Sequence, residues 1–174
     1  MEVLILAYSE RIEMQAVGIV HTKASQDEIR DHKEGLISQV EIFPQFVEAL
    51  DGLEGFSHLF IVAYLNQLRP EQIGPLKVRP RRLQRRGLKL QELPLVGVFA
   101  LDSPTRPNPI GLSVVSLLRI EGRVLTVSDL DLFDETPVLD VKPYQSSYRT
   151  ERFHIPEWQE RLRRKAGYRS TTHD

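Results

Sequence analysis

The stretch LVGVFALDSPTRPNPIGLSVVSLL, residues 95–118, reads as a strand, a stiff loop and a second strand. Residues 96–101 and 113–118 are apolar runs rich in residue types that favour β-strands. Between them, prolines at positions 104, 107 and 109 exclude a helix, because proline cannot donate the backbone hydrogen bond that a helix needs. The stretch therefore predicts a polar loop held between two buried strands.

This loop presents two polar side chains on a restricted backbone. Arg106 and Asn108 each precede a proline, and such residues are confined to extended or polyproline conformations. An arginine held in this way can bind a carboxylate or a phosphate through two donors of its guanidinium. We interpret Arg106 and Asn108 as candidate substrate-binding residues. A solvated, proline-rich connection between strands is an equally good interpretation of the composition alone.

The clearest hairpin of the sequence follows the loop. Residues 113–120 and 123–130 are apolar-rich runs separated by Glu121 and Gly122, which predicts antiparallel strands joined by a tight turn. If the second strand stays extended to its end, Ser128 and Leu130 face one way while Asp129 and Asp131 face the other. We therefore expect these two acids to point together.

Short extended segments dominate the rest of the chain. We expect strands at residues 13–21, 35–42, 56–65 and 138–141, a loop or short helix at 22–33, a helical turn at 43–50 and an amphipathic helix within 154–167. A regular alternation of strand and helix is missing, and so is a G-x-G-x-x-G motif, which argues against a doubly wound nucleotide-binding sheet. The predicted fold is mainly β: a small closed or nearly closed β-barrel with short helical additions and a C-terminal helix. We divide the chain into a leader or edge strand (1–12), the barrel domain (13–148) and a basic C-terminal extension with a short helix (149–174).

Composition limits the chemistry that the chain can use. The 174 residues suit one domain, carry a net charge of −1 and include no cysteine, so disulfides and thiol catalysis are excluded. The five histidines show no metal-ligand spacing, and we expect no metal site. No apolar run approaches the ~20 residues of a membrane span, so we expect a cytoplasmic protein without membrane association.

Positive charge is concentrated in two segments. Residues 77–89 carry seven basic and no acidic side chains, and residues 149–169 are rich in arginine. Local patches of this kind can bind phosphates although the whole chain is nearly neutral. A solvated surface excursion over residues 69–93 is an equally weighted interpretation of the first segment.

Three segments carry a resemblance to a known family: GLEGFSHLFIVAYL (52–65), the proline loop, and DLDLFDETPVLDVKPY (129–144). In this order they resemble the TsaA-like family, also called TrmO-type proteins. The resemblance implies a small β-barrel that binds S-adenosylmethionine and methylates the exocyclic nitrogen of threonylcarbamoyl-adenosine next to the anticodon in tRNA. It also implies a homodimer, and it gives the two basic segments a partner in tRNA.

The resemblance further implies cofactor contacts, carried over position by position. They fall after the strand that begins FSH, in the proline loop and around the segment before D-x-x-D-x-T-P, at Asn66, Gln67, Asp102, Leu112, Ser128, Asp129, Leu130 and Asp131. Leu112 is expected to line an adenine pocket, and Asp129 or Asp131 to accept from ribose hydroxyls or the amino group. For methyl transfer, Asp131 or Asp134 is the candidate base, with Arg106 and Asn108 as the other candidate catalytic residues.

The chain departs from the pattern of the family at three places. Asp102 stands where the family usually has arginine, Glu135 replaces the usual glycine, and an early Pro-Arg-Gln segment is missing, with only Arg30 nearby. Two other functions therefore stay open: an S-adenosylmethionine-binding or RNA-binding module without turnover, and a methyltransferase for another substrate.

Overall fold

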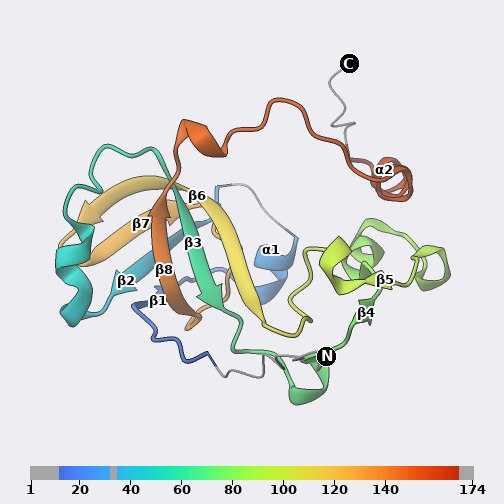
Figure 1. Cartoon of the computed structure of the whole chain (residues 1–174), viewed down its shortest axis with the longest axis horizontal. Coiled ribbons are helices and arrows are strands. Elements are labelled where there is room, and N and C mark those ends of the chain that lie inside the picture. Colours follow the sequence, from blue (N-terminus) through green and yellow to red (C-terminus); the bar gives the residue numbers. More distant parts are fainter. Residues whose placement is uncertain (1–11, 32–34, 169–174) are drawn as a thin grey trace, which may run out of the picture.

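The computed structural model describes residues 12–31 and 35–168 (Figure 1). The predicted leader or edge strand over residues 1–12 lies outside the described residues, apart from Ile12. Figure 1 shows a barrel on the left and a smaller unit on the right, which a long connection after β8 joins at the top of the view.

Six strands form a closed barrel in which every neighbouring pair is antiparallel. The order around the barrel is β1-β2-β7-β6-β3-β8, and β8 pairs with β1 to close it. The strands are β1 (Gly18–His21), β2 (Ile37–Ile42), β3 (His58–Tyr64), β6 (Ile110–Glu121), β7 (Val124–Ser128) and β8 (Pro137–Pro143). This architecture confirms the predicted mainly-β, closed-barrel fold.

The barrel interior is filled by small and branched apolar side chains at alternate strand positions. In β2, Ser38, Val40 and Ile42 are buried while Ile37 and Gln39 are exposed, as expected for a strand with one face inside a barrel. The same alternation is present in β1 and β3, whereas β7 buries the three consecutive residues Leu125, Thr126 and Val127. The buried apolar residues of the strands form one core cluster: Val20, Val40, Ile42, Leu59, Ile61, Ala63, Val115, Leu125, Val127 and Val138. The period of the sequence and the burial therefore agree in β1, β2 and β3.

A second, smaller core lies outside the barrel. The helix α2 (Glu157–Lys165) packs through Leu162 on Leu88 and Leu93, and Trp158 is a packing residue at its edge, as its amphipathic pattern predicts. The interpretation of residues 69–93 as a solvated surface excursion is therefore wrong in part, because this segment supplies buried leucines to α2. Its backbone forms β4 (Lys77–Val78) and three 3-10 helices, η2 (Pro70–Gln72), η3 (Arg81–Arg86) and η4 (Leu90–Glu92).

The strand predicted at residues 96–101 is much shorter. β5 (Val96–Gly97) pairs with β4, and the amide of Val98 still donates to the carbonyl of Leu76 over 2.9 Å. The carbonyl of Val98 accepts from the amide of Leu101 over 3.2 Å, which closes a tight turn within the chain. The chain therefore turns into a 3-10 helix, η5 (Val98–Ala100), instead of continuing as a strand.

The other predicted elements are present within a few residues of their expected bounds. The segment expected to be a loop or short helix contains α1 (Gln26–Arg30), and the helical turn is η1 (Pro44–Leu50). β6 and β7 form the predicted hairpin, but Glu121 pairs with Val124, so the turn residues are Gly122 and Arg123. Of the helices that the structure describes, none is both long and apolar enough to cross a membrane.

Candidate functional site

The three segments that carry the family resemblance meet at one end of the barrel. The amide of Leu65, just after β3, donates to the carbonyl of Pro109 at the end of the proline loop over 2.8 Å. Gly111, at the start of β6, is tightly enclosed, because a Cβ there would lie 3.0 Å from Leu65 Cδ2 and 3.3 Å from Leu132 Cδ2. The end of β3, the start of β6 and residues 129–136 are therefore in direct contact.

Asn66 and Gln67 tie the end of β3 to the turn that precedes β8. The Gln67 side-chain amide donates to the carbonyl of Asp134 over 2.6 Å, and the Asn66 amide donates to the carbonyl of Glu135 over 3.3 Å. Both side chains are exposed. Gln67, a predicted cofactor-binding residue, thus bonds the backbone of Asp134, a predicted base, and Asn66 bonds the next residue along the chain.

The expectation that Asp129 and Asp131 project from one face of an extended strand is wrong. β7 ends at Ser128, and Asp129 has φ of +65°, a left-handed conformation that breaks the alternation and that aspartate tolerates better than most residues. The Asp129 carboxylate accepts from the Gly35 amide at 2.8 Å and the Ser128 hydroxyl at 3.0 Å, whereas Asp131 accepts from the Ser113 hydroxyl on β6. The two acids therefore contact different strands.

The remaining predicted positions on this segment differ in exposure. Leu130 is only 2% exposed and belongs to the barrel core, so its side chain is not available to a ligand. Asp134 is exposed, and its Oδ1 accepts from the amide of Thr22 at 2.9 Å. Glu135 has φ of +59°, a left-handed conformation that glycine adopts more readily than glutamate.

The proline loop is held against the loop that contains η2. The carbonyl of Arg106 accepts from the Gly74 amide at 3.3 Å, and the Arg106 side chain is half-buried and donates back to the carbonyl of Ser103 at 3.4 Å. Asp102 and Asn108 are exposed. The loop is thus ordered as predicted, while its guanidinium turns toward its own backbone.

Leu112 projects outward from the barrel. Its side chain is 62% exposed, and it belongs to an apolar outer face of β3 and β6 on which Tyr64 pairs with Ile110 and Phe60 with Val114. An apolar wall of this kind can pack against the flat face of a base or against another protein.

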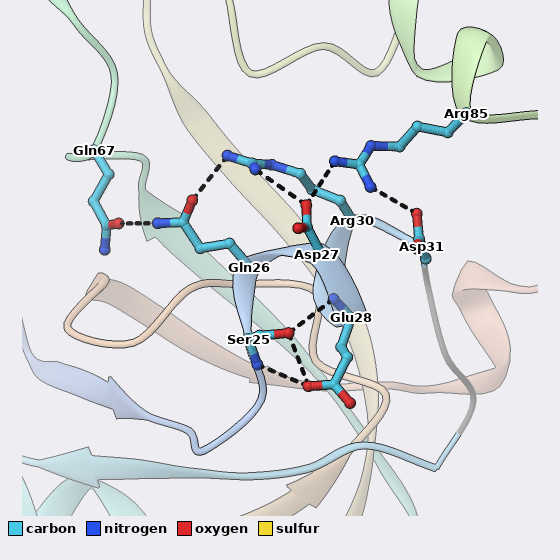
Figure 2. Close-up of polar contacts among 8 residues, drawn as sticks. All are labelled: Ser25, Gln26, Asp27, Glu28, Arg30, Asp31, Gln67 and Arg85. Atoms are coloured by element: carbon cyan, nitrogen blue, oxygen red, sulfur yellow. Dashed lines mark hydrogen bonds and ion pairs between the residues drawn. The ribbon is translucent and has the colours of Figure 1, made fainter.

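Helix α1 is a part of this region that sequence reasoning left without a function. Ser25 and Glu28 form a capping box at its start: the Ser25 hydroxyl accepts from the Glu28 amide, and the Glu28 carboxylate accepts from the Ser25 amide (Figure 2). The signal S-x-x-E was available in the sequence and predicts the start of this helix. The side-chain amide of Gln26 then donates to the side-chain oxygen Oε1 of Gln67 over 3.2 Å, which connects α1 to the candidate site.

The opposite side of α1 binds the basic 3-10 helix η3. Arg85 donates to Asp27 over 2.7 Å and to Asp31 over 2.9 Å (Figure 2). The hydrogen bond from Arg85, together with its positive charge, lowers the pKa of Asp27, and the two carboxylates raise the pKa of Arg85. Through these contacts α1 links the end of β3 to the basic segment 77–89.

Comparison with known proteins gives one consistent result. The family described as tRNA-methyltransferase O N-terminal domain matches residues 22–149. A relative from Archaeoglobus fulgidus named "Probable S-adenosyl-L-methionine-binding protein" is 36% identical over 140 residues, which cover 78% of this chain and 35% of that protein. The mouse tRNA (adenine(37)-N6)-methyltransferase is 40% identical over 107 residues, 62% of this chain and 23% of that protein. A crystal structure of TrmO superimposes with a TM-score of 0.63 at 31% identity and covers 83% of this chain and 64% of that one.

The chain spans only part of these relatives, about a third of the archaeal protein and less than a quarter of the mouse enzyme. The matched residues, however, include the barrel strands β2, β3, β6, β7 and β8 and all three segments that meet at the barrel end. This chain belongs to the family of tRNA-methyltransferase O N-terminal domains.

Proposed function

We propose that the chain is an S-adenosylmethionine-dependent tRNA methyltransferase whose site lies at the end of the barrel where β3 ends and β6 begins. The observation that carries the proposal is the direct contact between the three family-like segments, made by the Leu65–Pro109 and Gln67–Asp134 hydrogen bonds. The names of the mouse and archaeal relatives support both the reaction and the cofactor.

The groups at this end of the barrel fit an adenosyl cofactor. Leu112 offers an exposed apolar surface for adenine, Asn66 and Gln67 offer amides, and Asp129 and Asp131 offer carboxylates for hydroxyl or ammonium groups. Leu130 could contact the cofactor only through its backbone, because its side chain is buried. Ser128 could contact the cofactor through its backbone or through its hydroxyl, which already donates to Asp129. The negative charge of Asp102 is compatible with a cationic sulfonium ligand. S-adenosylmethionine supplies the methyl group from that sulfonium.

Cofactor binding can be tested at Gln67 by isothermal titration calorimetry. We expect Q67A to bind S-adenosylmethionine at least about fivefold more weakly, because it removes an amide and frees the turn at Asp134, at about 1 kcal/mol for one hydrogen bond. The matched control is Q39A, an exposed glutamine on β2 outside the candidate site. A well-folded wild-type protein that binds no cofactor would overturn the proposal.

Methyl transfer requires a nucleophile held in line with the methyl group, and orientation alone can supply about 7 to 11 kcal/mol of the barrier in favourable cases. We assign this positioning to Arg106 and Asn108 and removal of the proton from nitrogen to Asp131 or Asp134. R106A is expected to lower the turnover of labelled cofactor with bulk tRNA while leaving the melting temperature unchanged. Unchanged turnover would remove Arg106 from the mechanism.

The finer substrate is proposed to be threonylcarbamoyl-adenosine next to the anticodon. Methyl incorporation into tRNA that carries this modification, and none into the same tRNA without it, is the expected result. Equal incorporation into both would show that another adenosine is the target.

A binding module without turnover is the second candidate, and Asp102 favours it because this carboxylate replaces the arginine usual in the family. Binding of labelled S-adenosylmethionine and tRNA without incorporation of methyl would support the module. A D102R variant that gains methyl transfer would locate the missing function at that position.

We also propose a cytoplasmic homodimer assembled through the outer apolar face of β3 and β6. Val114 and Leu118 of β6 are 47% and 51% exposed, and exposed apolar side chains of this kind are typical of a protein–protein contact. Light scattering should give twice the chain mass for the wild type and the monomer mass for L118E. A wild-type monomer would overturn the dimer without affecting the proposed reaction.

A further inference from the structure

A basic hollow lies between α1 and the smaller unit, on the side of α1 that faces away from Gln67. Its volume is about 250 Å³, and it is lined by Arg30, Asp31, Arg82, Arg85, Arg86 and Tyr168. The lining thus holds four guanidinium groups against one carboxylate and includes no aliphatic side chain. This excess of positive charge suits a hydrated anion.

The four arginines are not equivalent. Arg85 is saturated by Asp27 and Asp31, and Arg30 contacts Asp27 at 3.6 Å. Within residues 12–31 and 35–168, by contrast, neither Arg82 nor Arg86 forms an ion pair. The Arg86 guanidinium lies 5.1 Å from the centre of the Tyr168 ring, which leaves its charge uncompensated.

Arg85 has a positioning role in this hollow. Its ion pairs with α1 fix η3 beside Arg30, so the guanidiniums of Arg82 and Arg86 are held near one place although η3 is a short 3-10 helix. The Tyr168 ring contacts both the Arg86 and the Arg163 guanidinium, which lie 5.1 Å and 5.2 Å from its centre, and this packing fixes the second wall. Preorganised guanidiniums lose little side-chain entropy when they bind an anion.

We infer that this hollow binds a backbone phosphate of an RNA, with Arg82 and Arg86 as its principal donors. The inference rests on the proposed function, because α1 connects the hollow to the candidate site: one end of α1 contacts Gln67 and the other lines the hollow. A five-residue helix is only about 7.5 Å long, so an RNA with one nucleotide at the barrel end can reach the hollow with a neighbouring phosphate. Guanidiniums bind phosphate through paired N–H donors, which matches this lining.

The experiment measures the salt dependence of tRNA affinity by fluorescence anisotropy between 50 and 200 mM NaCl. Each phosphate contact contributes about 0.7 to 0.9 to the slope of log K against log salt. We expect R82A/R86A, which removes both principal donors to this one phosphate, to lower the slope by about this amount, and R82A alone to lower it by part of this amount. If the affinities are equal at 1 M salt, the double variant then binds up to about eightfold more weakly at 0.1 M salt. R82K keeps the charge and should keep most of the slope.

The matched control is R119A, which removes the same charge from an exposed position on β6 near the hairpin turn. Affinity and slope should stay at the wild-type values in R119A, and cofactor binding by calorimetry should stay unchanged in all variants.

If R82A and R86A change the slope no more than R119A, while the wild type binds and methylates tRNA, the phosphate site is wrong and the proposed function stands. Poly-glutamate is tested as a competitor of the bound RNA, beside unlabelled RNA of equal charge. If both competitors displace the RNA from the wild type equally, and R82A no longer responds to poly-glutamate, the hollow binds acidic protein segments. That result would overturn the assignment to RNA. A wild type that binds cofactor but no tRNA would overturn both the phosphate site and the tRNA substrate.

Discussion

Replacing Gly18 by alanine should destabilise the barrel at the place where it closes. Gly18 pairs with Ile42 on β2 and with Val138 on β8, so it contributes to both neighbouring ladders. A Cβ on Gly18 would lie 2.5 Å from the carbonyl oxygen of Glu41 and 3.2 Å from Ile42 Cδ1. The Glu41 oxygen belongs to the backbone and cannot rotate away, so the added methyl group must displace β1 from β2.

The expected cost follows from overpacking. An inserted methyl group in a tightly packed interior costs about 1 to 3 kcal/mol. For a chain of 150–250 residues each kcal/mol lowers the melting temperature by about 2 to 4 °C. G18A should therefore melt roughly 2 to 12 °C below the wild type. We expect a fall in melting temperature in the upper half of that range, because the shift of β1 disturbs its pairing with both neighbouring strands.

The matched control is G97A on β5. Gly97 has φ of −60°, and no described atom lies within 4 Å of the position its Cβ would take. This variant should be neutral or gain about 0.4 to 1 kcal/mol, because alanine restricts the unfolded chain more than glycine does. Thermal unfolding followed by circular dichroism measures both variants. A melting temperature of G18A equal to that of G97A would refute the steric reasoning.

Two further predictions concern the surface of the same fold. Because Arg85 lowers the pKa of Asp27 in the folded state, this carboxylate stabilises the protein above about pH 4, and that contribution is lost as the pH falls through the lowered pKa. D27N should therefore lose less stability than the wild type between pH 6 and pH 3 in urea titrations, and an equal loss would contradict the prediction. E135G should relieve the positive φ of 59° and gain about 1 kcal/mol, raising the melting temperature by roughly 2 to 4 °C; a lower melting temperature would show that the Glu135 side chain stabilises the turn.

Much of the barrel could be predicted because its determinants are local. The alternation of Ser38, Val40 and Ile42 specifies which face of β2 is buried, and the prolines of the loop before β6 exclude a helix whatever surrounds them. The capping box of Ser25 and Glu28 is equally local and specifies where α1 begins. Signals of this kind depend on residues a few positions apart, so one chain is enough to detect them.

The errors have a common cause in distant partners. The strand that begins at Val96 pairs only with the two residues of β4, about twenty positions earlier in the chain, and the chain then turns into η5. Leu88 and Leu93 lie in a segment whose composition is typical of a solvated loop, and the helix that buries them lies about 70 residues later. Asp129 leaves the extended conformation and binds the amide of Gly35, 94 residues away.

Strand period, proline and glycine act through the local backbone, so these features of the chain were enough to predict the class of fold, the polar loop between two strands and the family. The folded arrangement sets which polar groups meet. It brought Gln67 to Asp134, Ser113 to Asp131 and Arg85 to two acids of α1, and it separated Asp129 from Asp131. These contacts depend on how the barrel closes and on how the smaller unit packs beside it, and no short-range pattern in the chain encodes that arrangement.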